Sequence, residues 1–151
     1  MLTKNKIYRI IFEELNKLRE EDYRGSHKAA NKEYGSPLYD VTLNGTYPED
    51  FYSPRGNMYY GGGLEWDSAV IRLIQTYKNR PKREITVYRA VPNIDSIVSI
   101  NPGDWVTIRK EYADMHGESA LDGDYKILKM KVPSSALWTD GNSPYEWGYN
   151  P

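Results

Sequence analysis

The chain has 151 residues, a formal net charge of −1 and no cysteine. Without cysteine it cannot form disulfides, iron–sulfur clusters or thiolate zinc sites, and with only two histidines, His27 and His116, we expect no metal centre. The near-zero charge also gives no general attraction to nucleic acid or to an anionic membrane, so neither is the expected partner.

Residues 4–20 carry an amphipathic helical pattern. Thr3 is placed to cap the helix, and apolar residues recur at steps of three and four: Ile7, Ile10, Ile11, Leu15 and Leu18. We expect a helix that packs this apolar face against the rest of the domain. Charged residues interrupt the apolar run, so it is neither a signal peptide nor a membrane span, and a soluble cytoplasmic protein is expected.

Residues 21–65 lack periodicity and are rich in Gly, Pro, Asn, Asp and Tyr. Such a long irregular stretch is uncommon inside a domain unless it is functional or contains short elements, so we expect turns and at least one short helix. A lid over a ligand, a surface that recognises an acceptor and simple packing all stay open as its role. The consecutive glycines at 61–63 lack the spacing of a dinucleotide-binding motif and predict a hinge or turn.

A second helix is predicted over residues 68–78, with Asp67 as its N-cap and Pro81 after its end. The next pattern is typical of a strand over residues 85–91. Its alternation places Arg89 on the same side as three apolar residues, Ile85, Val87 and Val91. Because a buried arginine needs a partner, we expect Arg89 to meet an internal carboxylate or to line a cleft that receives an anion.

Short elements follow to the end of the sequence. We predict a strand over 105–107, a helix over 109–116 closed by Gly117, a strand over 125–132, a brief strand or turn at 136–138 and a strand over 146–149. Helices and loops in residues 1–80, followed by strands in 84–151, predict an α+β fold in a single domain that spans residues 1–151.

Three ordered stretches resemble a known family. They are Tyr-Arg-Ala-Val-Pro at 88–92, Gly-Asp-Trp-Val-Thr at 103–107 and Glu-Trp-Gly-Tyr at 146–149. Similar strings occur in ADP-ribosyltransferase-like domains of bacteriophage and mobile-element polyvalent proteins. The order Arg89, Thr107, Glu146 also resembles the Arg, Ser/Thr and Glu elements of mono-ADP-ribosyltransferases. The likeness covers the chain from about residue 35 onward, and it implies two small, packed, mostly antiparallel sheets.

The resemblance implies that NAD is the substrate and assigns roles to residues. Glu146 would hold the ribose 2′-hydroxyl and stabilise an oxocarbenium-like transition state, a task that suits a carboxylate. Arg89 would bind NAD through its phosphates or its nicotinamide ribose. Thr107 would orient Glu146 or contact the nicotinamide side. The residues expected to contact NAD are Tyr88, Arg89, Thr107, Tyr112 and Trp147, with Tyr112 positioned to stack on nicotinamide.

The acceptor of ADP-ribose is left open. Arginine-modifying members carry a second acidic residue two positions before the catalytic glutamate, and here that position is Pro144. Either the acceptor is not a protein arginine or another group, such as Asp140, substitutes. We expect a macromolecule, a host protein in particular, in the host cytoplasm if a phage encodes the chain. Hydrolysis of NAD is the other outcome of the same chemistry.

Two other functions stay open. In a ribonuclease-like enzyme, His116, Glu146, Arg89 and Thr107 would act on a phosphodiester. In a non-catalytic binding module, the tyrosines and tryptophans would recognise a partner. Each site residue also has a structural interpretation: Glu146 as the ion-pair partner of Arg89, Thr107 as a helix N-cap, and Tyr112 and Trp147 as core residues.

Overall fold

The structure is a computed structural model that describes residues 3–8, 10–11, 14–15 and 29–151. The N-terminal helix predicted over residues 4–20 is confirmed for residues 4–8, 10–11 and 14–15, and its remaining residues lie outside the described part. Its apolar side chains do not pack as expected: Ile7, Ile10, Ile11 and Leu15 are 43–52% exposed. Among the described residues, no helix has the length and apolarity needed to cross a membrane.

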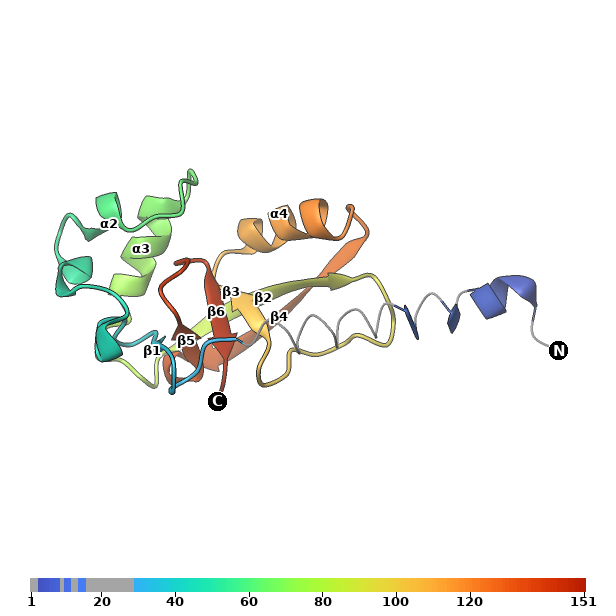
Figure 1. The fold of residues 1–151 in the computed structure, drawn as a ribbon, viewed down its shortest axis with the longest axis horizontal. Coiled ribbons are helices and arrows are strands. Elements are labelled where there is room, and N and C mark those ends of the chain that lie inside the picture. Colours follow the sequence, from blue (N-terminus) through green and yellow to red (C-terminus); the bar gives the residue numbers. More distant parts are fainter. Residues whose placement is uncertain (1–2, 9, 12–13, 16–28) are drawn as a thin grey trace.

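The strands form one six-stranded sheet in the order β1-β5-β6-β3-β2-β4, in which every neighbouring pair is antiparallel (Figure 1). Their bounds are β1 Ser36–Pro37, β2 Glu84–Pro92, β3 Trp105–Thr107, β4 Tyr125–Pro133, β5 Leu137–Thr139 and β6 Glu146–Tyr149. The mixed helix-and-strand class and the antiparallel pairing are as predicted. The expectation of two sheets is wrong, because β6 pairs with both β5 and β3 and so joins the short C-terminal strands to the long β2–β4 ladder.

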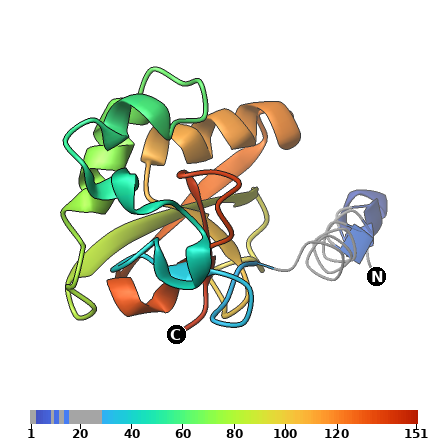
Figure 2. The ribbon, with the colours of Figure 1, turned by 60° about the vertical axis from the view of Figure 1, so that its left-hand side comes forward.

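The helices pack against the sheet and against one another. They are α2 Gly56–Tyr59, α3 Asp67–Gln75 and α4 Lys110–Ala120, with 3₁₀ turns at Leu43–Gly45, Glu49–Tyr52 and Ser134–Ala136. The short helix expected within residues 21–65 is therefore present in the described portion of that stretch. Figures 1 and 2 show α4 alongside β2 and β4, the strands that it contacts most.

Thr3 caps the N-terminal helix as predicted, because its Oγ1 accepts a hydrogen bond of 3.3 Å from the backbone N–H of Lys6, but two other helix boundaries predicted from single residues are wrong. Asp67 is the first residue of α3 rather than its N-cap, which is Trp66. Gly117 does not end α4, which continues to Ala120. A Cβ at Gly117 would lie 2.4 Å from the ring of Tyr125 on β4, so glycine is needed here for close packing of helix on strand rather than for termination.

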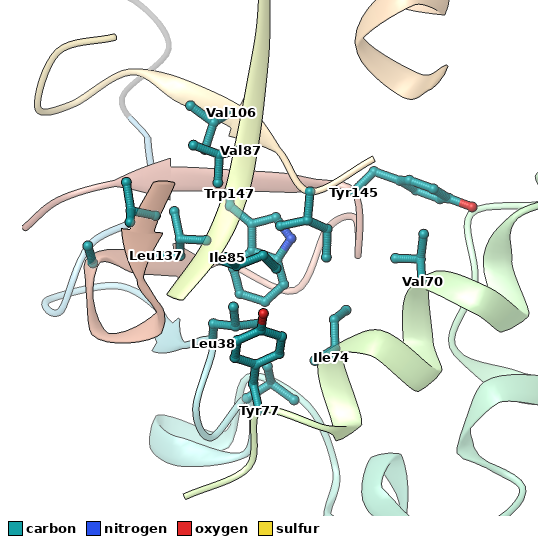
Figure 3. Packing of buried hydrophobic residues seen from close by; sticks show 14 of the residues in the cluster. Leu38, Val70, Ile74, Tyr77, Ile85, Val87, Val106, Leu137, Tyr145 and Trp147 are labelled. Atoms are coloured by element: carbon teal, nitrogen blue, oxygen red, sulfur yellow. The ribbon is translucent and has the colours of Figure 1, made fainter. Parts of the chain in front are cut away.

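The hydrophobic core lies on one face of the sheet (Figure 3). Val87, Val106 and Trp147 project from three neighbouring strands toward α3, whose Val70 and Ile74 are buried against them. The irregular stretch also contributes fully buried side chains, Leu38, Val41 and Phe51. Packing is therefore one role of that segment, a role that its sequence left open.

Candidate functional site

Glu146 opens β6, and the strand register sets its neighbours. Antiparallel pairing places Glu146 opposite Thr107 on β3, and Thr107 opposite Tyr88 on β2. Directly opposed residues of an antiparallel sheet share a face, so these three side chains form one row across three strands. Thr107 is 4% exposed, whereas Glu146 is exposed. The row thus presents an accessible carboxylate beside a buried hydroxyl.

Helix α4 lies over this face because of the junction that precedes it. The Thr107 Oγ1 accepts a hydrogen bond of 3.2 Å from the backbone N–H of Arg109, and α4 begins at the next residue. One turn into the helix, the Tyr112 hydroxyl donates to Glu146 Oε1 at 2.8 Å. A hydrogen bond to a carboxylate is stronger than one between neutral groups and fixes the direction in which the carboxylate points.

A second tyrosine supports the first. The rings of Tyr112 and Tyr145 stack at a centroid distance of 4.8 Å and an interplanar angle of 10°. The Tyr145 hydroxyl donates to Asp67 Oδ1 at 2.6 Å, and the side chain is 1% exposed. Burial raises the pKa of Tyr145 and the hydrogen bond to Asp67 raises it further, so this hydroxyl stays a donor well into the alkaline range.

Asp67 also binds the backbone of the glycine-rich segment, residues 61–63, and of the residue that follows it. Its Oδ2 accepts hydrogen bonds from the backbone N–H groups of Gly63 at 2.8 Å and Leu64 at 3.1 Å. Partial burial raises the pKa of Asp67, but the hydrogen bonds from Tyr145 and from these backbone N–H groups outweigh it and hold that pKa below its ordinary value. A Cβ at Gly61 would lie 2.1 Å from the Asp67 carboxylate, so the chain at residues 61–63 passes close to this side chain, with a bend at Gly63.

Arg109 lies at the same end of the sheet. Its guanidinium carbon is 5.5 Å from the centroid of the Trp66 ring, and its Nε is 2.9 Å from Glu111 Oε2. The Arg109 side chain is 30% exposed. It comes two residues after Thr107 and lies beside the residue that precedes Asp67, so it brings a positive charge to the region of Glu146 and Tyr145.

Arg89 does not converge with Glu146 as expected. It lies in the neighbouring row with Val106 and Trp147, so its side chain projects from the other face of the sheet. There the side chain is 9% exposed, its Nη1 donates to the carbonyl of Trp105 at 2.8 Å, and its Nε is 3.8 Å from Asp104 Oδ2. The internal carboxylate predicted for this arginine is therefore Asp104, and the alternative ion pair with Glu146 is not what the structure contains.

Trp147 is also on the core face. It is 0% exposed, and its Nε1 donates to the carbonyl of Pro144 at 2.9 Å. The structure does not place this ring where a ligand can stack on it, so its core interpretation is the correct one. The other residues named from sequence are at the surface: His116 is exposed on α4, and Asp140 is exposed in the loop before β6, where it accepts a hydrogen bond from the N–H of Asn142.

The structure therefore brings together Tyr88, Thr107, Tyr112 and Glu146 from the predicted set, and adds Trp66, Asp67, Arg109 and Tyr145. Sequence reasoning missed the second group because Trp66 and Asp67 are distant along the chain. Arg109 had a local signal, since it follows Thr107 by only two residues. Within the described residues there is no group of three or more metal-binding side chains.

Comparison of the chain with protein-family models, with curated proteins and with solved structures found no match. The chemistry of the site is consequently argued from its own geometry. An exposed carboxylate, held by a tyrosine hydroxyl and set beside a threonine, can accept a hydrogen bond from a sugar hydroxyl or stabilise a developing positive charge.

Proposed function

We propose that the protein is a mono-ADP-ribosyltransferase that transfers ADP-ribose from NAD to a macromolecular acceptor. The observation that carries the proposal is the Glu146 carboxylate, exposed at the start of β6, oriented by Tyr112 and placed opposite Thr107. The sequence resemblance assigns the transition-state role to this glutamate, and the geometry gives it an orienting partner. A catalytic carboxylate needs such a partner because misplaced charge stabilises a transition state poorly.

The reaction requires little beyond charge stabilisation. The bond between nicotinamide nitrogen and the ribose anomeric carbon breaks, and nicotinamide leaves with the electron pair. Positive charge develops on the anomeric carbon and its ring oxygen, where a nearby carboxylate lowers its energy. A nucleophile of the acceptor then bonds to the anomeric carbon and loses its proton. If water takes this place, the outcome is hydrolysis of NAD.

Replacing Glu146 tests the proposal. We expect Glu146→Gln to retain the fold, because Gln keeps an acceptor for the Tyr112 hydroxyl, and to reduce transfer from labelled NAD to lysate proteins by about 100-fold or more. Covalent label, free nicotinamide and melting temperature are measured for each variant. Glu84→Gln is the matched control, since Glu84 is exposed at the start of β2, away from α4.

Labelling that is equal in the wild type and Glu146→Gln would contradict the catalytic role of Glu146. Nicotinamide release without transferred label would identify an NAD hydrolase. If the protein neither releases nicotinamide nor transfers label, the proposal of ADP-ribosyl chemistry fails, and the binding module becomes the better account.

A further inference from the structure

A closed series of contacts surrounds the start of β6. The Tyr112 hydroxyl donates a hydrogen bond to Glu146, and the Tyr112 ring stacks on that of Tyr145. The Tyr145 hydroxyl in turn donates a hydrogen bond to Asp67. The next residue back, Trp66, lies under the guanidinium of Arg109, whose backbone N–H bonds to Thr107, the strand partner of Glu146. The series therefore returns to Glu146, and Arg109 supplies the positive charge in it.

The side chain of Arg109 is held in a defined direction. Glu111 lies at its Nε edge, 2.9 Å away, and the Trp66 ring lies along its guanidinium at 5.5 Å. A cation–π contact and an ion pair at Nε restrict a side chain that is otherwise very flexible. Among the hydrogen bonds of the described residues, none comes from the terminal nitrogens of Arg109, and the side chain remains 30% exposed.

From this arrangement we infer that Arg109, rather than Arg89, is the anion-binding residue of the site and that it receives the diphosphate of the dinucleotide. The inference rests on the proposed function for the identity of the ligand. A guanidinium presents planar donors that match two phosphate oxygens at once. The backbone N–H of Arg109 donates to Thr107 Oγ1, which lies in the row of Glu146, whereas the Arg89 side chain projects from the opposite face.

The position of Trp66 beside Arg109 supports a ligand in which a diphosphate is linked to a ribose. A half-buried indole beside a guanidinium offers a flat apolar surface next to a charge, which suits a ligand that is part sugar or base and part phosphate. The existing pair with Glu111 is at Nε, so it leaves the terminal nitrogens of Arg109 accessible to a second anion. Arg109 would thus position the substrate while Glu146 acts on the ribose.

Binding of ADP-ribose tests the inference without requiring catalysis. We expect Arg109→Gln to raise the Kd for ADP-ribose and for NAD by about tenfold to a hundredfold, the range for a charge-assisted hydrogen bond, measured by titration calorimetry. Adenosine lacks the diphosphate, so its Kd should change less than about twofold. Arg109→Lys keeps the charge but loses the planar fork, and it should recover part of the affinity.

Arg72→Gln is the matched control, because Arg72 is an exposed arginine on α3. An unchanged Kd for ADP-ribose in Arg109→Gln, or equal weakening in Arg72→Gln, would overturn the inference, as would the absence of ADP-ribose binding to the wild type. Failure of the proposed function has a different signature. If Arg109→Gln weakens ADP-ribose binding but Glu146→Gln transfers label normally, the anion site stands and the catalytic proposal falls.

Discussion

The Tyr112 hydroxyl and the Glu146 carboxylate meet across 34 residues of chain, at 2.8 Å. The tyrosine was expected to stack on nicotinamide, but its ring stacks on Tyr145 and its hydroxyl bonds to the glutamate. Both the ring and the hydroxyl of Tyr112 therefore interact with other residues of the protein. We interpret Tyr112 as a positioning residue that holds the Glu146 carboxylate for the proposed reaction.

Removal of the hydroxyl alone tests this interpretation. Tyr112→Phe keeps the ring stacked on Tyr145 and deletes the hydrogen bond to Glu146, so we expect kcat to fall by about tenfold to a hundredfold. The KM for NAD and the melting temperature should change little, because the ring contact survives. The control is Tyr125→Phe, which removes a hydroxyl on β4 that donates a hydrogen bond to Asp114 on α4. A rise in KM with unchanged kcat would indicate contact with NAD instead.

The depressed pKa of Asp67 predicts a pH dependence of stability. A carboxyl whose pKa is lower in the folded state stabilises the fold fully above its unfolded pKa, and this stabilisation is lost as pH falls through the folded value. The wild type should therefore have a higher melting temperature than Asp67→Asn at about pH 6, and the gap should narrow below about pH 4. Thermal melts across this range measure it. A gap that stays constant down to about pH 2 would contradict the assignment.

At the scale of elements, the position of α4 decides where Tyr112 and Arg109 lie. The helix approaches β4 closely because Gly117 faces the ring of Tyr125, and its first turn is tied to β3 through the bond between Arg109 and Thr107. The helix is therefore fixed at both ends against the sheet that carries Glu146. A substitution at Gly117 should therefore disturb the position of α4 although Gly117 does not contact the site residues.

Gly117→Ala is expected to destabilise the protein by about 1–3 kcal/mol, because the new Cβ would lie 2.4 Å from the Tyr125 ring. The sign is the informative part, since glycine to alanine in an ordinary helix interior stabilises by roughly 0.5–1 kcal/mol. Chemical denaturation measures the change. In a Tyr125→Ala background, which removes the obstructing ring, the same substitution should become neutral or stabilising. Destabilisation that persists in that background would place the conflict elsewhere.

Strand elements were more predictable from sequence than helix boundaries. The predicted bounds of β3 and β6 are those of the structure. The observed β4 is one residue longer at its end, and β2 is one residue longer at each end. Strands are this predictable because alternation between turns is a strong local signal. The helix boundaries predicted from Gly117 and Asp67 were wrong because a glycine or an aspartate can serve several structural purposes. Their use here is set by Tyr125 and Tyr145, which are distant in sequence.

In the whole molecule, one sheet separates two environments. Its core face holds Trp147, Val106 and Arg89, while the other face holds Glu146, Thr107 and Tyr88. Sequence alternation correctly grouped Arg89 with apolar residues. The resemblance nevertheless combined Arg89 with Glu146, because the order of residues along a chain does not state which face of a sheet each one occupies. Pairing register decides that, and a one-residue shift would reverse it.

The hydrogen bond from Tyr145 to Asp67 spans 78 residues of chain, and it joins the glycine-rich segment at 61–63 to the strand-rich half. Closing so long a loop costs chain entropy that only the completed fold recovers, so this part of the site forms with the globule as a whole. A fragment that begins at residue 84 would keep the row of Tyr88, Thr107 and Glu146 in its sequence but lose Asp67 and Trp66. The site is thus a product of cooperative folding across both halves of the chain.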